Sequence, residues 1–342
     1  MPKVSVLIPI YNVEKYIERC ARSLFEQTLD DIEYVFVNDC TPDRSMELLR
    51  KTINEYPTRQ HAVKLINHER NQGVATVRNT GLAVATGEYV IYCDSDDWVE
   101  PTMYEDMYCT AKAADADVVG TDFYNEYSSY TTIQRQPFPD NNIECVRQML
   151  AEQLHCGTWN KLVRRDIYIR NNIRFPGGIN MWEDVLTMIP VCYYSSKIVY
   201  LPRAYYHYIH YNSASYTQSM SAGSLRDLVE AVDRLSSFIN AHSLFCLKKD
   251  FCLKALTVKL ILLLNSRGKQ QHDWNLLYPE TSKYILSHRQ MSCYWRLALK
   301  MASWKLLFVF NIMACIGNCV KYLENKWGDD SMLLYLPIWL YL

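Results

Sequence analysis

Short apolar segments alternate with helical segments over the first 93 residues, and this alternation constrains the fold more than any other feature. Predicted strands lie at 4–10, 32–37, 64–68 and 89–93, and predicted helices lie between them at 13–24, 45–56 and 73–85. Short, fully apolar strands that alternate with helices are typical of βαβ units, whose mainly parallel sheet is covered on both faces. We therefore expect an α/β fold with a Rossmann-like, mainly parallel sheet.

Each of the four predicted strands is followed by polar side chains. These are Tyr11 and Asn12, Asn38 and Asp39, Glu69 to Asn71, and Asp94 to Asp97. In an open parallel sheet, the ligand binds at the carboxyl ends of the strands, where loops and helix N-termini converge. The sequence therefore predicts that these residues line one crevice.

Three carboxylates, Asp94, Asp96 and Asp97, are crowded directly after the fourth strand. Crowded carboxylates repel one another, and a divalent cation relieves the repulsion. Oxygen ligands suit Mg²⁺ or Mn²⁺, which also bind diphosphate oxygens. A structural alternative stays open for Asp97 and Ser95, which could instead cap a helix that begins near Pro101.

Composition and missing motifs exclude several classes of protein. The chain has 36 Lys and Arg against 37 Asp and Glu, so no excess of positive charge favours nucleic acid as a partner. Neither GxxxxGK[ST] nor GxGxxG follows a predicted strand, and neither GxSxG nor HExxH occurs. A cation-dependent diphosphate site on an open α/β sheet remains.

Four fragments, in order and each at a predicted strand end, resemble the family 2 glycosyltransferases of the GT-A fold. They are Ile8-Pro9-Ile10-Tyr11-Asn12, Asn38-Asp39-Cys40-Thr41-Pro42-Asp43, Asn71-Gln72-Gly73 with Arg78-Asn79, and Asp94-Ser95-Asp96-Asp97. Trp159-Asn160-Lys161-Leu162 and Trp182-Glu183-Asp184 resemble later motifs of the family, which extends the likeness to about residue 215. The resemblance implies a non-processive enzyme of the bacterial surface-polysaccharide type, because the Gln-x-x-Arg-Trp motif of processive relatives does not follow Asp184.

The resemblance also implies how a nucleotide diphosphate sugar, by default a UDP-sugar, is held. Mn²⁺ or Mg²⁺ would be bound by Asp96 and Asp94 and would offset charge on the departing nucleoside diphosphate. Tyr11 would pack against the base, and Asp39 would accept a hydrogen bond from the base or ribose. The full set of implied nucleotide contacts is Pro9, Tyr11, Asp39, Asn71, Arg78, Asp94 and Ser95.

For the reaction, the resemblance implies an inverting transfer to an acceptor hydroxyl, with Asp184 as general base. Glu183 and burial near Trp182 would raise the basicity of Asp184. Without the upstream motifs, the same acids would be first-turn residues favoured by the helix dipole. The acceptor is expected to be a polysaccharide or lipid-linked glycan intermediate, and the acceptor-site candidates are Trp182, His207 and His210. A structural role for the two histidines, an idle sugar-nucleotide-binding protein and a nucleotidyltransferase stay open as alternatives.

The chain is expected to divide into a catalytic domain at 1–215 and a helical region at 216–342. The apolar stretch 306–316 is shorter than the roughly 20 residues that span a bilayer. Two interpretations stay open for this region: a buried core or homo-oligomer contact, and a peripheral membrane contact helped by Trp304 and the apolar tail 332–342. The first ten residues lack a signal-peptide core, so we expect a cytoplasmic location. Both a free position in the cytoplasm and one at the inner face of the cell membrane stay open.

Overall fold

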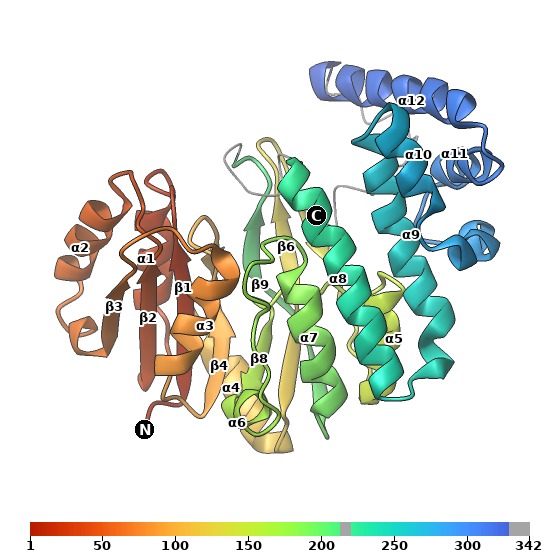
Figure 1. The fold of residues 1–342 in the computed structure, drawn as a ribbon. Coiled ribbons are helices and arrows are strands. Elements are labelled where there is room, and N and C mark those ends of the chain that lie inside the picture. The colour runs from red at the N-terminus through yellow and green to blue at the C-terminus, as the bar shows by residue number, and fades with distance from the viewer. Residues whose placement is uncertain (213–219, 328–342) are drawn as a thin grey trace. The chain divides into compact units, whose positions relative to one another are not determined.

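A computed structural model describes residues 1–212 and 220–327 of the chain, with side chains described as far as residue 317 (Figure 1). Contacts divide the chain into two compact units. The first is Met1–Val146 with Leu154–Ser219, and the second is Arg147–Gln153 with Met220–Leu342. The predicted division of roles at residue 215 is not tested by this partition and stays a prediction.

A nine-stranded sheet forms the centre of the first unit, in the order β3-β2-β1-β4-β8-β6-β9-β5, with β7 paired to β6 (Figure 1). The strands are β1 (Val4–Ile10), β2 (Ile32–Asn38), β3 (Val63–Asn67), β4 (Tyr89–Tyr92), β5 (Trp98–Val99), β6 (Val118–Glu126), β7 (Thr131–Gln134), β8 (Lys161–Arg164) and β9 (Ile198–Ile209). The helices that lie between these strands in the sequence are α1 (Ile17–Phe25), α2 (Ser45–Glu55), η1 (Gln60–Ala62), α3 (Val74–Val84), α4 (Met103–Ala114), α5 (Asn142–Leu150), α6 (Arg165–Arg170) and α7 (Glu183–Tyr194).

Strand direction decides where the loops of this sheet meet. Strands β3, β2, β1 and β4 are parallel, and β8 runs antiparallel to both β4 and β6. Strand β6 is therefore parallel to β4, and β9 is parallel to β6. The carboxyl ends of β1 to β4, β6 and β9 consequently open at the same edge of the sheet, which we call the polar edge.

The predicted alternation of strands and helices is confirmed over the first 93 residues, and α7 begins and ends where the sequence predicts. The stretch 124–142, predicted as a loop or hairpin, does contain a hairpin, but β6 was missed and continues to Glu126. Strand β6 carries buried polar side chains that look like loop residues in the sequence. One of them, Asp122, accepts hydrogen bonds from Gln136 N (2.6 Å) and the Tyr200 hydroxyl (2.8 Å), which makes its burial tolerable.

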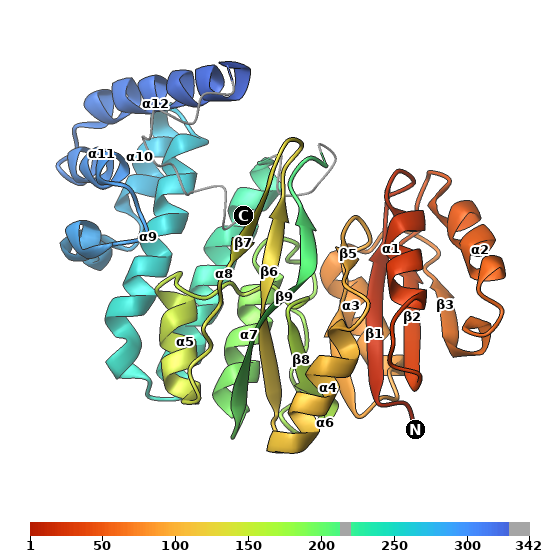
Figure 2. The ribbon, with the colours of Figure 1, turned by 180° about the vertical axis from the view of Figure 1, so that it is seen from behind.

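Helices cover both faces of the sheet. Helices α1 and α4 lie on one face, in front in Figure 2, and α3 and α7 lie on the other face, in front in Figure 1. The apolar stripe of α1, including Ile17, Cys20 and Leu24, packs with β1 and with Met103 and Met107 of α4 in one buried cluster. The helices thus fix the strands whose ends carry the polar residues.

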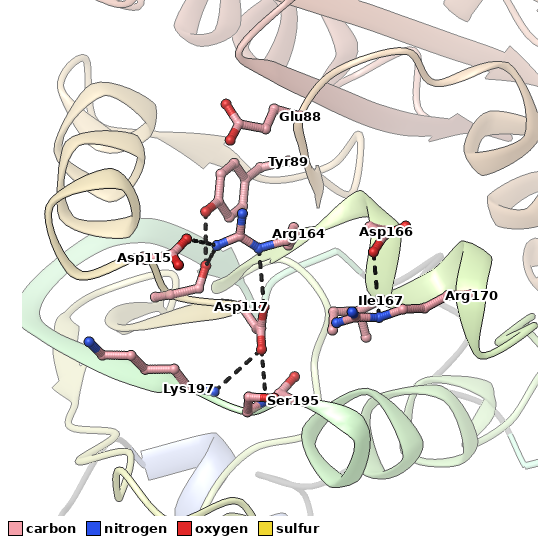
Figure 3. Close-up of polar contacts among 12 residues, drawn as sticks. Glu88, Tyr89, Asp115, Asp117, Arg164, Asp166, Ile167, Arg170, Ser195 and Lys197 are labelled. Carbon is pink, nitrogen blue, oxygen red and sulfur yellow. Dashed lines mark hydrogen bonds and ion pairs between the residues drawn. The ribbon is translucent and has the colours of Figure 1, made fainter.

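The edge opposite the polar edge is fastened by Arg164 at the end of β8 (Figure 3). Its guanidinium binds Asp117 Oδ1 at 3.1 Å and Asp115 Oδ1 at 2.6 Å, and it lies over the ring of Tyr89. The second oxygen of Asp117 accepts a hydrogen bond from Ser196 N at 2.7 Å. This network joins β4, β6, β8 and the start of β9, so it is a structural feature remote from the predicted crevice.

The described part of the second unit is helical, as predicted. Its helices are α8 (Ala222–Ala241), η3 (Phe245–Leu247), α9 (Lys248–Leu264), α10 (Gly268–Leu276), η4 (Pro279–Ser287), α11 (Cys293–Ser303) and α12 (Leu307–Trp327). Phe310 and Ala314 of α12 are buried in a core with Trp295 of α11, whereas Phe308 is 77% exposed. Among the described helices, none combines the length and the apolarity needed to cross a bilayer. The predicted apolar tail at 332–342 lies outside the described residues.

Candidate functional site

Asp39, at the end of β2, holds the loop that precedes α3. Its carboxylate accepts hydrogen bonds from Gln72 N and Gly73 N, both at 2.9 Å, and lies 2.8 Å from His68 Nδ1. Gly73 has φ 83°, and a Cβ there would overlap the side chain of Asn180, so the turn requires glycine. The exposed Asn71 lies in this loop. A carboxylate accepts about four hydrogen bonds, and Asp39 already has three such contacts. It can therefore accept only about one further hydrogen bond from a nucleotide.

The turn after β1 presents Tyr11 to solvent, with 49% of its surface exposed. The next residue, Asn12, has φ 57°, a left-handed conformation that asparagine adopts more readily than most residues. The main-chain N–H of Asn12 donates to Thr41 Oγ1 at 2.8 Å, which ties the turn to the loop after β2. Pro9 lies within β1, one residue before the strand ends. Tyr11 is therefore placed at the polar edge with an open ring face.

Arg78 of α3 joins two acidic residues that are far apart in the sequence. Its Nη2 lies 3.0 Å from Asp94 Oδ1, and its Nη1 binds Glu183 Oε1. Burial lowers the pKa of Arg78, but the charges of Asp94, Glu183 and Asp184 together raise it, so the guanidinium stays charged. The nucleotide contact predicted for Arg78 stays a prediction. Its contacts show that Arg78 positions Asp94 and Glu183.

Asp97 does not cap a helix, so that alternative is wrong. Helix α4 begins at Met103 after Thr102, and no side chain caps it, which excludes Ser95 as well. Asp97 Oδ2 accepts from the Tyr206 hydroxyl at 2.6 Å, and its Oδ1 accepts from Ile209 N at 2.8 Å. Burial and the neighbouring Asp96 and Asp94 hold the pKa of Asp97 well above its usual range. Asp97 therefore fastens β9 to residues 94–97 after β4, which we call the carboxylate loop.

The carboxylate of Asp96 accepts a hydrogen bond from Asn212 Nδ2 at 2.8 Å, and its main-chain oxygen accepts one from Arg19 Nη2 at 3.0 Å. Burial, followed by the charge of Asp94, raises the pKa of Asp96 to about 6. A cation beside the pair would stabilise the charged form of both carboxylates.

Within the described residues, no group of three or more His, Cys, Asp or Glu side chains could hold a metal ion. Mg²⁺ commonly binds through one or two carboxylates, with substrate phosphates and water completing its shell. Asp94 and Asp96 fit such an oxygen donor set. Metal dependence stays a prediction.

Glu183 and Asp184 begin α7 and have different surroundings. Glu183 is buried against Arg78; burial raises its pKa, and the Arg78 guanidinium bound to Oε1 lowers it and favours the charged carboxylate. Asp184 is only half-buried, and its Oδ1 accepts from Val185 N at 2.7 Å. Trp182, which precedes them, is buried with φ 66°. Of the two carboxylates, Asp184 is the more exposed, whereas Glu183 binds Arg78.

His207 is enclosed on all sides in β9. Its Nδ1 lies 2.6 Å from Glu126 Oε1, and its Nε2 lies 3.1 Å from Glu100 Oε1. The ring is stacked between Trp98, at 3.4 Å, and Tyr124, at 4.4 Å. With both nitrogens and both faces engaged, these contacts favour the structural alternative over the predicted acceptor contact.

His210 follows β9 at the polar edge and is half-buried. Its Nε2 lies 2.8 Å from Asn125 Oδ1, and its ring stacks on Tyr127 with 4.5 Å between the ring centres. Burial lowers the pKa of His210 to about 4. The ring is therefore neutral at physiological pH, so its predicted contact with an acceptor would not involve a positive charge.

Sequence reasoning missed three residues that hold the carboxylate loop in place. They are Arg19 of α1, Tyr206 of β9 and Asn212 after β9. Asn212 could have been found by the rule that polar residues at strand ends share an edge, had β9 been recognised as parallel to β4. Arg19 and Tyr206 carry no comparable signal, because their partners lie 77 and 112 residues away in the sequence.

Comparisons with known proteins give consistent matches. The family description "Glycosyl transferase family 2" matches residues 5–171. EpsJ of Bacillus subtilis is 35% identical over 191 residues, which are 54% of this chain and 54% of EpsJ. EpsH of the same organism is 30% identical over 273 residues, covering 73% of this chain and 78% of EpsH. This chain thus spans about half the length of the first of these relatives and three quarters of the second.

Among solved structures, the crystal structure of S. aureus TarS 1–349 in complex with UDP-GlcNAc matches with a TM-score of 0.67 and 19% identity. The match covers 96% of this chain and 93% of the TarS chain. At this identity, the likeness informs the fold alone. It confirms the expected α/β fold of the GT-A class with a helical C-terminal region.

The first prediction concerns His210 and the pH dependence of stability. Because its pKa is about 4 in the folded protein and 6.5 in an exposed histidine, the unfolded state binds more protons between these values. The contribution of His210 is therefore complete above pH 6.5 and is lost as the pH falls toward 4. Urea titrations from pH 4 to 8 should show a shallower acid loss of the free energy of unfolding in His210→Gln than in the wild type.

His61→Gln, at an exposed histidine of η1, controls for the loss of one imidazole. A His210→Gln profile that runs parallel to the wild-type profile over this range would contradict the burial of a neutral His210.

Proposed function

Because the chain belongs to glycosyltransferase family 2, we propose that it transfers one sugar from a nucleotide diphosphate sugar to an acceptor hydroxyl, with inversion at the anomeric carbon. The observation that carries the proposal is the meeting of Asp39, Arg78, Asp94, Asp96 and Asp184 at one edge of the sheet. Calorimetry with UDP, GDP and dTDP, with and without Mn²⁺, tests it. No binding of any diphosphate would overturn it.

The nucleotide is proposed to bind over the ends of β1, β2 and β3. The exposed ring of Tyr11 offers a face for the base, and Asp39 and Asn71 lie beside the turn that precedes α3. Aromatic rings stack well on flat heterocycles. UDP is the expected nucleotide, and the TarS structure with UDP-GlcNAc on a similar fold supports that choice.

Asp94 and Asp96 are proposed to hold Mn²⁺ or Mg²⁺ together with the diphosphate oxygens. Such an ion supplies positive charge against the oxygens of the leaving group. The chain itself prepares this site, since Arg78 orients Asp94 and Asn212 orients the carboxylate of Asp96. Ser95 lies between the two acids and is buried.

Asp184 is proposed to accept the proton of the acceptor hydroxyl. As the proton moves to the carboxylate, the hydroxyl oxygen forms a bond to the anomeric carbon, and the bond from that carbon to the phosphate oxygen breaks. The electron pair leaves with the nucleoside diphosphate, so charge and atoms balance in one displacement. The missing Gln-x-x-Arg-Trp motif supports transfer of a single sugar, to a polysaccharide or lipid-linked glycan intermediate. An idle binding protein would bind donor without turnover, and a nucleotidyltransferase would not need Asp184.

The second prediction concerns the metal ligands. Asp96→Ala should remove the Mn²⁺ dependence of UDP binding and lower turnover by about 1,000-fold or more, because metal ions supply several kcal/mol of charge stabilisation. Calorimetry and donor-turnover assays measure the two effects. Asp166→Ala, at an exposed aspartate of α6 that pairs with the exposed Arg170, is a control away from the polar edge and should change neither. Unaltered Mn²⁺-dependent binding by Asp96→Ala would show that Asp96 is not a ligand.

The third prediction separates the two acids that begin α7. Asp184→Asn keeps the shape but not the basicity, so turnover should fall by about 100 to 10,000-fold while UDP affinity stays the same. Glu183→Gln still accepts a hydrogen bond from Arg78, so turnover should fall less than tenfold. Steady-state kinetics of both variants, with proton NMR of the first-formed product, provide the readout. Near-normal turnover of Asp184→Asn, or retained anomeric configuration, would contradict the assignment.

For the second unit, we propose that α12 lies on an anionic membrane surface, where a lipid-linked acceptor would be found. Phe308, Ile312 and Ile316 recur at four-residue spacing and are 77%, 46% and 52% exposed. Trp304 precedes them and is 59% exposed, with the Lys300 ammonium over its ring. Apolar side chains beside lysines suit the interface of an anionic bilayer. A cytoplasmic location is part of this proposal.

The fourth prediction tests this surface. The wild-type protein should sediment with phosphatidylglycerol vesicles at low salt. Phe308→Asp should stay in the supernatant, because a carboxylate on the exposed face opposes contact with an anionic bilayer. The variant should still fold, because the buried face of α12 is unchanged. Ile169→Asp, at an exposed apolar residue of α6, should sediment like the wild type. Failure of the wild type to sediment would overturn the membrane proposal. If the protein instead forms a concentration-dependent dimer that Phe308→Asp abolishes, the exposed face of Phe308, Ile312 and Ile316 is a homo-oligomer contact.

A further inference from the structure

A ladder of aromatic rings runs along β9 and reaches the turn between β6 and β7. Each ring lies within 5.4 Å of the next, measured between ring centres, and most neighbours are nearly parallel. In order, the rings are Tyr206, Trp159, Tyr208, His210, Tyr127 and Tyr130. The first ring is fully buried, whereas the last is 51% exposed.

The buried end of the ladder is bonded to the carboxylate loop. The hydroxyl of Tyr206 donates to Asp97 and accepts from Asp94 N at 3.1 Å. Farther along, Ile209 N donates to Asp97, and His210 N donates to Glu126 O at 2.9 Å. The rings therefore lead from the acids of the polar edge outward, along strands that end at this same edge.

The outer end of the ladder is a rigid pair of tyrosines. Tyr127 stacks on Tyr130 at 4.6 Å with 24° between the planes, and Tyr127 N donates to Tyr130 O at 3.0 Å. Polar groups surround the pair, because Ser128 and Ser129 are exposed and Thr131 donates to Glu126 Oε2 at 2.6 Å. An aromatic face held in place by packing loses little conformational entropy when a ligand covers it.

This arrangement matches the surface of a pyranose ring. A sugar ring has faces formed by C–H groups and a rim of hydroxyls, so a tyrosine ring bordered by hydroxyl and carboxylate groups is complementary to it. Core packing explains Tyr206, Trp159 and Tyr208, which are buried or nearly so. It does not explain Tyr130, whose exposed half adds little to the stability of the hairpin.

The position of the ladder distinguishes acceptor from donor. In the sheet, β6 and β9 lie on one side of β4, and β1, β2 and β3 lie on the other side. The carboxylate loop follows β4, and the residues proposed for the nucleotide follow β1 and β2. Figure 2 shows β6, β7 and β9 on the side of the sheet away from β2 and β3. A ligand on the ladder therefore lies across the carboxylate loop from the nucleotide.

We propose that the exposed ring of Tyr130, supported by the stacked rings of Tyr127 and His210 behind it, binds a pyranose unit of the acceptor glycan. The proposal rests on the function proposed above and specifies its acceptor as a saccharide that is bound by ring stacking beyond the hydroxyl that reacts. Of the acceptor-site candidates predicted from the sequence, His210 is the one whose ring lies on the ladder, where it supports Tyr127 from the side away from Tyr130.

The fifth prediction is tested by saturation-transfer NMR with cellotriose, maltotriose and chitotriose at millimolar concentration, on the full chain. At least one trisaccharide should receive saturation from the wild type. Tyr130→Ala should weaken its apparent Kd by about tenfold, the effect expected for one lost aromatic stack. Tyr130→Phe should bind as the wild type does, since it keeps the ring. Ile133→Ala is the matched control, because Ile133 is 58% exposed on β7 but outside the ladder.

Thermal unfolding and UDP calorimetry of the same samples separate the two proposals. Tyr130→Ala should keep the unfolding temperature and the UDP affinity of the wild type. Bound UDP without binding of any trisaccharide would overturn the acceptor site alone, and so would trisaccharide binding that is unchanged in Tyr130→Ala. Trisaccharide binding without any nucleotide diphosphate binding would instead overturn the proposed transferase function and leave a saccharide-binding site.

Discussion

The buried charge of Arg78 constrains the polar edge more than any other interaction. A guanidinium that is only 7% exposed is tolerated because Asp94 and Glu183 both bind it, and removing one partner of a buried pair typically costs about 3 to 5 kcal/mol. Its partners come from the loop after β4 and from the start of α7, so α3 fixes both with a single side chain. Asp184 follows Glu183 directly. The position of the proposed base therefore depends on an ion pair in which the base itself takes no part.

Tyr206 has a similar effect on the other side of the carboxylate loop. Its hydroxyl satisfies the main chain of Asp94 and the carboxylate of Asp97, while its ring stacks on Trp159 at 4.4 Å. Unsatisfied buried polar groups are costly, so this network keeps the loop in one conformation. Asp94 is thus held from α3 through Arg78 and from β9 through Tyr206, whereas Asp96 is held by Asn212 and Arg19. Rigidity of this kind prepares a site before substrate arrives.

The sequence predicted those parts of the structure that local patterns determine. Apolar periodicity located β1 to β4 and α7, and polar residues after strands pointed to Asp39, Asp94 and Asp96. Pairings between distant segments had no local signal. Arg78 meets Glu183 across 105 residues, and Asp97 meets Tyr206 across 109, so neither the role of Glu183 nor that of Asp97 could be predicted. Strand β6 was missed because buried polar side chains in it, such as Asp122 and Asn125, have their hydrogen-bond partners outside the strand. The histidine ring of His207 looked available because its two glutamate partners lie on other strands or loops.

Among the described strands, β7 pairs with β6 alone, and a turn of four residues, 127–130, joins the two. None of the contacts that hold Arg78, Asp96 or Asp39 passes through this turn. The sequence of the turn can therefore vary without disturbing the residues proposed to bind the donor. A chain with a different turn would keep the contacts of Arg78, Asp96 and Asp39. If the turn binds the acceptor as proposed, exchange of these four residues would change which glycan is bound and leave the donor side intact, and a library confined to the four codons would sample that change.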